Sequence, residues 1–329
     1  MSAPAITAGG SGRTKSILSS LRGGDLIAHM VALLFASTVI IVTAFLVWEL
    51  WIHCAPSRQK FGFNFFVTQD WDPSHGQFGA LPFIYGTVVT SILALIISVP
   101  LGVGAAIFLA ELAPRKLSEW ATFMVELLAA VPSVIYGLIA IFTLIPLMRT
   151  YIEPFLKHTL GVVPGIGPLF SGPASGGGYL TAAVVLAVMT FPFIISISRE
   201  ALLEVPRDQR EAALALGATR WESTIQVVVP YARLGIFGSI FLGLARALGE
   251  TMAVTMVIGN DSNLHASLLA NGYTIASVIA NEFAEASDDL HLSSLIEIGL
   301  VLFLITIVIN ALARVMVIAT AGKGTAKGA

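Results

Sequence analysis

Residues 206–230 read PRDQREAALALGATRWESTIQVVVP and predict two helices joined by a sharp turn. Pro206 suits the first position of a helix, because its missing N–H would have no intrahelical partner there. The run that follows is rich in alanine and leucine and favours helix, and Gly217 is placed to end it with a positive φ. Thr219 and Glu222 have the spacing of a capping box, which predicts the start of the second helix.

The sequence around this hairpin is that of a membrane protein. Of its 329 residues 56% are hydrophobic and only 12% are charged, and the mean hydropathy of +0.86 is too high for a soluble domain. A helix needs about 20 apolar residues to cross the roughly 30 Å hydrocarbon core. Six segments meet this requirement and predict an all-α integral membrane protein with six transmembrane helices. They are Ile27 to Trp51, Phe83 to Ala110, Ala121 to Leu147, Tyr179 to Ser198, Leu234 to Gly259 and Leu295 to Thr320.

The distribution of Lys and Arg predicts the orientation of these spans. Thirteen of the 18 basic residues fall in the N-terminal segment, in 111–120, in 199–233 and at the C-terminal end, which the six spans place on one side. Four fall on the other side, and Arg246 lies inside the fifth span. By the positive-inside rule, both termini and the 206–230 hairpin are expected in the cytoplasm, with the chain in the plasma membrane.

The chain offers little for chemistry of its own. Its net charge of −2 gives no global basic field for nucleic acid. A single cysteine, Cys54, excludes an intrachain disulfide and a multi-cysteine metal framework. The tail sequence AGKGT at 321–325 fails as a phosphate loop, because Val317 and Gly324 stand where glycine and Ser or Thr are required. We therefore assign no catalytic residue, no metal site and no cofactor to this chain.

The spacing within the hairpin resembles the EAA loop of the permease subunits of ATP-binding cassette (ABC) importers. The matching positions are Glu211, Ala212, Ala213, Gly217 and Pro230. The resemblance implies that the first helix docks on a separate ATPase subunit and transmits its motion, with Glu211, Ala212, Ala213 and Gly217 as the coupling residues. A solvated cytoplasmic hairpin is the alternative.

A narrower resemblance runs from Phe83 to Arg314, to the PstC-type permeases of phosphate-specific importers. The stretches that carry it are AAVPSVIYGL (129–138), FPFIISISREAL (191–202), GLARALGETMAVTMVIGN (243–260) and NGYTIASVIANEFAEA (271–286). It implies a type I ABC importer (MetI-like) permease fold that carries phosphate. The partners it implies are a homologous permease (PstA), two copies of an ATPase (PstB), which bind ATP and Mg, and an external phosphate-binding protein (PstS).

These inferences give a domain organisation. We expect a cytoplasmic N-terminal segment at 1–26 and a first transmembrane helix at 27–51. A type-1 permease domain follows at 83–320, with the coupling loop at 206–230, and a cytoplasmic tail occupies 321–329. The stretch SGPASGGG at 171–178 is expected to be a flexible outer linker.

Two charges in the fifth predicted span are candidates for the substrate pathway. Arg246 lies twelve residues into that span, and Glu250 follows at i+4, so an unbroken helix would place both on one face. Charges in hydrocarbon are costly and commonly functional, and the guanidinium of arginine matches phosphate oxygens. We expect Arg246 to attract or gate the anion and Glu250 to balance it. The alternative is an ion pair that only locks two permease subunits together.

The external segment 260–294 carries five carboxylates and no Lys or Arg. Its local charge would repel free phosphate, which fits delivery by a docked binding protein. A merely solvated helix from about Thr274 to Ala286 is the equal alternative. For the whole chain, the rivals are a permease for another oxyanion such as molybdate or sulfate, a secondary transporter or channel, and a sensor without transport.

Overall fold

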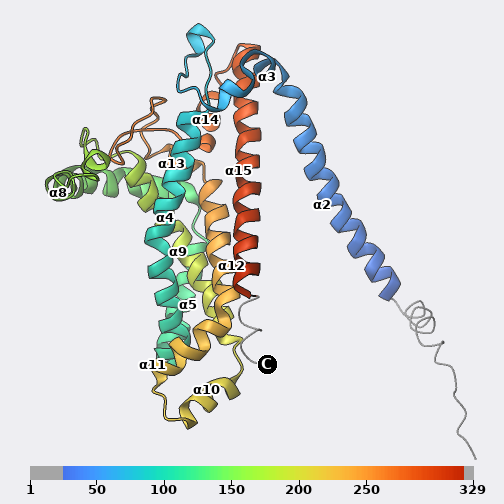
Figure 1. Cartoon of the computed structure of the whole chain (residues 1–329), viewed down its shortest axis with the longest axis vertical. Helices are drawn as coiled ribbons and strands as arrows, with labels where there is room; N and C mark the ends of the chain where they lie inside the picture. The colour runs from blue at the N-terminus through green and yellow to red at the C-terminus, as the bar shows by residue number, and fades with distance from the viewer. Residues whose placement is uncertain (1–24, 322–329) are drawn as a thin grey trace, which may run out of the picture. The chain divides into compact units, whose positions relative to one another are not determined.

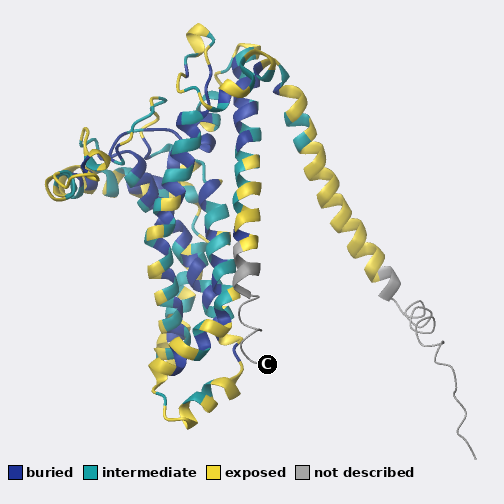
Figure 2. Ribbon diagram, viewed as in Figure 1, coloured by how far each residue is buried: buried dark blue, intermediate teal, exposed yellow. Residues whose placement is uncertain are grey.

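A computed structural model describes residues 25–321 of the chain (Figure 1). The predicted N-terminal segment 1–26 and the tail 321–329 lie almost entirely outside this range. Contacts divide the chain into two units, the first ending at His53 and the second beginning at Cys54. The first unit contributes helix α2 (Asp25–His53), whose side chains from Ala28 onward are mostly exposed (Figure 2). Its apolar surface is what a helix facing lipid requires.

The regular secondary structure of the described part of the second unit consists of helices, which loops connect, together with two isolated bridges. Its longer helices are α4 (Leu81–Ile107), α5 (Arg115–Ala129), α9 (Tyr179–Leu203), α12 (Val229–Leu248) and α15 (Asp289–Ala321). The shorter ones are α3 (Ala55–Phe61), α6 (Ser133–Ile139), α7 (Ile145–Leu147), α8 (Glu153–Thr159), α10 (Arg207–Ala215), α11 (Arg220–Ser223), α13 (Met252–Thr255) and α14 (Ile275–Glu282). Short 3₁₀ turns lie at 62–66, 73–75 and 167–170, and π turns at 108–112, 140–144, 148–152 and 224–228.

Helices α4, α9, α12 and α15 form a bundle with α9 at its centre (Figures 1 and 2). Close contacts between α9 and its neighbours are made by small residues. A Cβ added at Gly102 of α4 would stand 2.8 Å from the Ile194 side chain of α9. The buried hydroxyls of Ser198 on α9 and Ser239 on α12 lie 2.7 Å apart and share a hydrogen bond. Small residues allow helices to approach closely in membranes, where the hydrophobic effect drives no association.

Six helical segments within residues 25–321 are long and apolar enough to cross a membrane, as predicted. They are Ala28–His53, Leu81–Leu112, Ser133–Thr159, Tyr179–Leu203, Arg220–Leu248 and Asp289–Val315. The third and fifth differ substantially from the predicted ranges.

The prediction of the third span as one continuous helix from Ala121 to Leu147 is wrong. Helix α5 ends at Ala129, Pro132 is extended with ψ 141°, and a new helical segment begins at Ser133. Proline disfavours the helical conformation in the residue before it, here Val131, so the ladder breaks at this point. In Figure 1, α5 runs along the bundle whereas α6 to α8 leave it sideways.

The glycine-rich stretch 171–178, predicted as a flexible linker, is packed against the rest of the unit. The Gly176 N–H donates to the buried Glu153 carboxylate at 3.1 Å, and the Gly178 N–H donates to the Val257 carbonyl at 3.1 Å. Gly176 has φ +82°, and a Cβ there would lie 2.5 Å from the Ile145 carbonyl oxygen. Glycine at this position therefore serves close packing.

Candidate functional site

The 206–230 hairpin lies at one end of the bundle and has the predicted local structure (Figure 1). Pro206 is the N-cap of α10 rather than its first residue. Gly217 has φ +89°, the left-handed conformation that lets the chain turn out of α10. At the start of α11 the Thr219 hydroxyl accepts from the Glu222 N–H, while the Glu222 carboxylate accepts from the Thr219 N–H, completing the capping box.

The four predicted coupling residues lie together on this hairpin. Glu211, Ala212 and Gly217 are exposed, and Ala213 is partly exposed, so most of this surface is open for a partner. Glu211 also lines a pocket of about 460 Å³ between α10, α11 and the end of α4.

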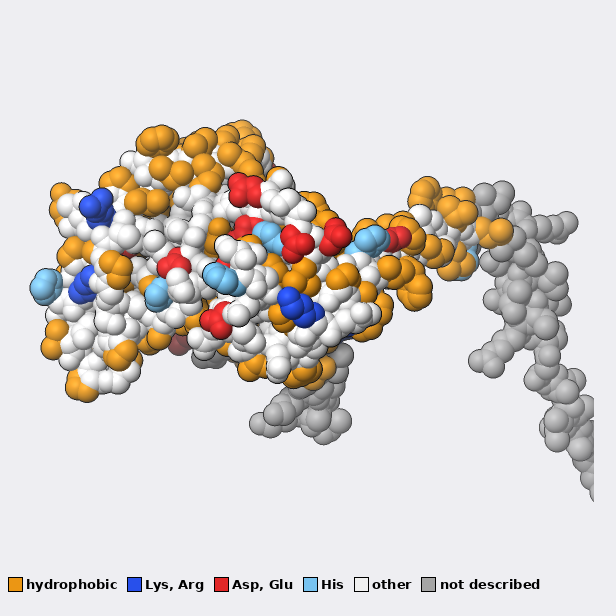
Figure 3. Space-filling view, turned by 90° about the horizontal axis from the view of Figure 1, so that it is seen from above, with side chains coloured by type: hydrophobic (Ala, Val, Ile, Leu, Met, Phe, Trp, Pro, Cys, Tyr) orange, Lys and Arg blue, Asp and Glu red, His pale blue; other side chains and the backbone are white. Residues whose placement is uncertain are grey.

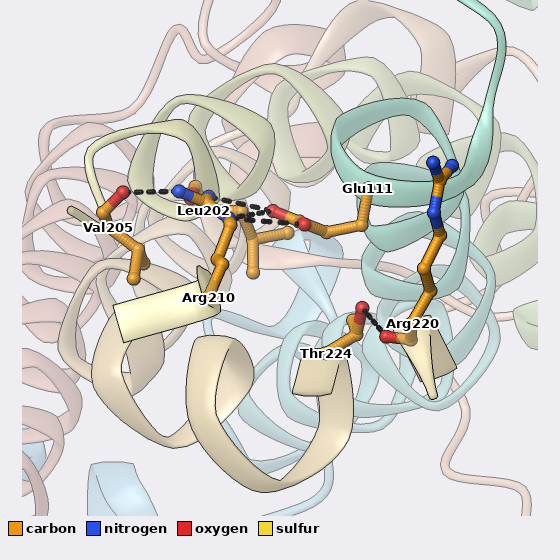
Figure 4. A network of polar contacts seen from close by, with 6 residues as sticks. All are labelled: Glu111, Leu202, Val205, Arg210, Arg220 and Thr224. Carbon is orange, nitrogen blue, oxygen red and sulfur yellow. Dashed lines mark hydrogen bonds and ion pairs between the residues drawn. The ribbon is translucent and has the colours of Figure 1, made fainter. Parts of the chain in front are cut away.

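A network of polar contacts joins α10 to the rest of the bundle through Arg210 (Figure 4). The guanidinium Nη2 donates to Glu111 Oε1 at 2.8 Å, and Nε lies 3.2 Å from both carboxylate oxygens. The same side chain donates to the backbone carbonyl of Leu202 at 2.7 Å and to that of Val205. Both charged side chains are largely buried, at 20% and 12% exposed. We call this set of contacts the Arg210 junction.

The Arg210 junction was not predicted from the sequence. Glu111 lies on the π turn that extends α4, and Leu202 and Val205 lie at the end of α9. Arg210 and Glu111 are 99 positions apart, so no local spacing relates them. The only available signal was an arginine at the edge of an alanine-rich helix.

The two candidate pathway residues are not paired, which corrects the expectation of one shared helix face. Helix α12 ends at Leu248, Gly249 is its C-cap, and Glu250 lies beyond it. The Glu250 carboxylate instead accepts from the Ala253 N–H at 3.3 Å. Gly249 follows the helix with ψ near 1° and ends the helical geometry that the i+4 argument assumed.

Arg246 is placed in the last turn of α12, where a cation complements the negative end of the helix dipole. Its guanidinium carbon lies 4.3 Å from the centre of the Phe193 ring of α9, a cation–π geometry. Its buried Nε has no hydrogen-bond partner among the described residues. In Figure 1 this end of α12 stops within the bundle, short of the end where α14 lies. The guanidinium of Arg246 therefore contacts the face of the Phe193 ring, while its Nε donor remains available for a hydrogen bond.

The opposite end of the bundle carries acidic side chains (Figure 3). A pocket of about 720 Å³ there is lined by Glu282, Glu285 and Asp288, among others. In the neighbouring loop, burial alone would raise the pKa of the Asp261 carboxyl. Hydrogen bonds from the backbone and side chain of Asn263, and the nearby His265, instead hold this pKa below its usual range.

Helix α14 at this end is anchored rather than merely solvated. Its residues 275–278 are buried, and the Ile275 N–H donates to the Thr87 hydroxyl of α4 at 2.9 Å. At its end, Glu282 accepts from the Trp71 indole at 2.9 Å and lies 3.0 Å from His291 Nε2. The alternative of a simply solvated helix is therefore wrong.

Comparisons with known proteins place the chain in a family. Residues 98–319 match the family described as "Binding-protein-dependent transport system inner membrane component". The chain is 46% identical over 292 residues to the "Phosphate transport system permease protein PstC" of Mesorhizobium japonicum, covering 89% of each protein. It is also 46% identical to the protein of the same name from Haemophilus influenzae, covering 86% of this chain and 90% of that one.

A solved structure supports the same fold. The chain superposes with a TM-score of 0.57 and 16% identity on a chain of a bacterial alginate ABC transporter in complex with an alginate-bound periplasmic protein. The match covers 86% of this chain and 93% of that one. The fold is that of a type I ABC importer permease. The chain belongs to the family of binding-protein-dependent transport system inner membrane components and, within it, to the PstC phosphate transport permeases.

Proposed function

We propose that this chain is the permease subunit of an ATP-driven importer that carries inorganic phosphate across the plasma membrane by alternating access. The observation that carries the proposal is 46% identity across 89% of the chain to a phosphate transport system permease. A match over 292 of the 329 residues necessarily includes the 206–230 hairpin. The family assignment makes the chain a transport component and not the ATPase, and it disfavours another oxyanion as cargo.

The chain works within an ABC transporter complex that includes an ATPase and a binding protein. The finer proposal is a homologous permease of the PstA type, two PstB ATPases, which hold ATP and Mg, and a PstS binding protein outside the cell. Glu211, Ala212, Ala213 and Gly217 are the proposed ATPase-coupling residues, because they form an accessible helix and turn at one end of the bundle.

Arg246 is the proposed pathway residue. It stays charged at physiological pH, lies inside the bundle, and keeps a buried donor without a partner among the described residues. Glu250 holds the backbone that follows the break in the fifth span, rather than neutralising Arg246. The break ends α12 two residues after Arg246, and helices interrupted in this way form the substrate sites of many secondary transporters.

We further propose that both termini and the 206–230 hairpin face the cytoplasm and that the acidic end faces outward. The hairpin and the acidic pocket lie at opposite ends of the bundle, in agreement with the distribution of basic residues. The acidic end would then receive the binding protein.

The proposal is tested by expressing the chain with its three partner proteins in a bacterial host that lacks its own high-affinity phosphate import. Uptake of radiolabelled phosphate should appear, should require a catalytically competent ATPase partner, and should persist when an uncoupler collapses the proton gradient. Uptake that survives an inactive ATPase but is lost with the uncoupler would identify a secondary transporter instead.

A further inference from the structure

We propose that Arg210 is a positioning residue that joins the coupling helix α10 to the ends of α4 and α9, so that these three elements move as one when ATP is hydrolysed. The inference rests on the proposed function, because it assigns a path for the motion that the ATPase delivers. It adds two residues, Arg210 and Glu111, to the four proposed coupling residues.

The geometry of the Arg210 junction supports this inference. One guanidinium on α10 contacts two other segments: it binds the carboxylate of Glu111 after α4, and the carbonyls of Leu202 and Val205 at and just beyond the end of α9. Leu202 belongs to the last turn of α9 and Val205 lies two residues beyond its end, so the guanidinium binds the backbone where the chain leaves that helix. The planar fork of arginine can serve a carboxylate and carbonyls at once, which the point charge of lysine cannot match.

Helix α10 is exposed and packs mainly against its own hairpin, α11 and the 224–228 π turn. No residue of α10 is buried, whereas α4 and α9 pack closely along their length. A push on α10 therefore reaches the ends of α4 and α9 through the covalent chain and the Arg210 junction, whereas the packing of α10 against the 224–228 π turn leads into the fifth span. Coupling of this kind needs a contiguous physical connection between the two sites, and the junction supplies one.

Helix α9 connects the Arg210 junction to Arg246. Counting from the junction toward the other end of the bundle, α9 carries the Phe193 ring that contacts Arg246 and then Pro192. The neighbouring Ile194 fits against Gly102 of α4 at close range. A displacement of the joined ends of α4 and α9 is therefore transmitted along α9 to Phe193, which contacts Arg246 of α12.

The same end of the bundle offers a matched control. Arg115 and Glu119 on α5 also pair at 2.8 Å, but they are 91% and 61% exposed and both belong to one helix. An exposed pair within one helix contributes little and connects no separate elements. Arg115→Gln changes the same charge at the same end of the bundle without affecting the Arg210 junction.

The test uses the assembled transporter carrying Arg210→Gln, Arg210→Lys, Glu111→Gln or Arg115→Gln. Three quantities are measured: the amount of ATPase that copurifies, the stimulation of ATP hydrolysis by the binding protein, and phosphate transported per ATP hydrolysed. Glutamine has neither the charge nor the planar fork that serves the carboxylate and the two carbonyls together, so we expect Arg210→Gln to lower the transport ratio roughly tenfold or more. Arg210→Lys and Glu111→Gln should fall in between, and Arg115→Gln should match the unmodified protein.

A purely structural role would lower the amount of copurified ATPase while the ratio per assembled complex stayed normal, and that result would overturn the proposal. An unchanged ratio in all three junction variants would overturn it as well. If Arg210→Gln fails to assemble, Arg210→Lys and Glu111→Gln decide the question. Failure of the proposed function gives a different result from failure of this inference, because the unmodified complex would then transport no phosphate. In that case the stimulation of ATP hydrolysis by the binding protein would still show whether the junction variants differ from the unmodified protein.

Discussion

Replacing Gly217 isolates the turn that ends the coupling helix. Gly217 has φ +89°, and a Cβ built on it meets no atom within 4 Å. A side chain there would therefore cause no clash within the chain, and its cost comes from backbone conformation alone. For an ordinary L-residue that cost is about 1–2 kcal/mol in the left-handed region, or roughly a five- to thirtyfold change in an equilibrium. Asparagine tolerates this conformation better, and a β-branched residue tolerates it least.

We therefore expect Gly217→Val to impair coupling most, Gly217→Ala less, and Gly217→Asn least. The assay measures the amount of ATPase that copurifies and the phosphate transported per ATP hydrolysed. Gly104→Ala is the control, because Gly104 lies inside α4 without positive φ and its added Cβ also meets nothing within 4 Å. That change should be neutral or stabilising, since alanine favours helix over glycine. The reasoning is refuted if Gly217→Val behaves like the unmodified protein, or if a Gly217→Val, Glu211→Ala double variant transports normally.

Two further predictions concern the pathway and the topology. Arg246→Ala should abolish most uptake. The double variant Arg246→Glu, Glu250→Arg should assemble but still fail to take up phosphate, because the two side chains do not pair in the unmodified protein. Each exchanged charge would also lie at a helix end whose dipole has the wrong sign for it. Near-normal flux in the exchange variant would show that they act as a pair. With buried Cys54 replaced, a cysteine at exposed Ser74 should react with an impermeant thiol reagent added outside, whereas one at Asp208 should react only after the membrane is opened. Equal external labelling at both positions would contradict the proposed orientation.

The hairpin could be predicted from sequence because its signals are local. Gly217, Thr219 and Glu222 act on the backbone within a few residues of themselves, and each has the predicted role. The number of spans followed from apolar length in the same way. These features depend on chain composition and short spacing, which a single sequence contains.

The breaks in the third and fifth spans were not predicted, because hydropathy does not distinguish a kink from a helix end. Pro132 and Gly249 are both compatible with a continuous helix, and the surrounding packing decides the outcome. The pairing of Arg246 with Glu250 failed with the unbroken helix on which it was based.

The Arg210 junction required tertiary structure, because it joins segments that are distant in sequence. Glu111 precedes Arg210 by 99 positions. The guanidinium of Arg210 also donates to a backbone carbonyl of a different segment, that of Leu202 in α9. Every residue has a backbone carbonyl, so the sequence does not show which carbonyls accept hydrogen bonds from a distant side chain. Only the folded arrangement of α4, α9 and α10 identifies them as partners of one guanidinium (Figure 4).

The most direct test of the central claim is transport by the purified four-component complex in sealed vesicles. ATP is supplied on the side of the 206–230 hairpin, and the binding protein is supplied on the side of the acidic end. Radiolabelled phosphate uptake and ATP hydrolysis are measured together while arsenate, sulfate or molybdate is added in excess. The account predicts ATP-dependent phosphate uptake that arsenate inhibits and that sulfate and molybdate leave unchanged. Preferential transport of sulfate or molybdate, or phosphate flux without ATP hydrolysis, would contradict it.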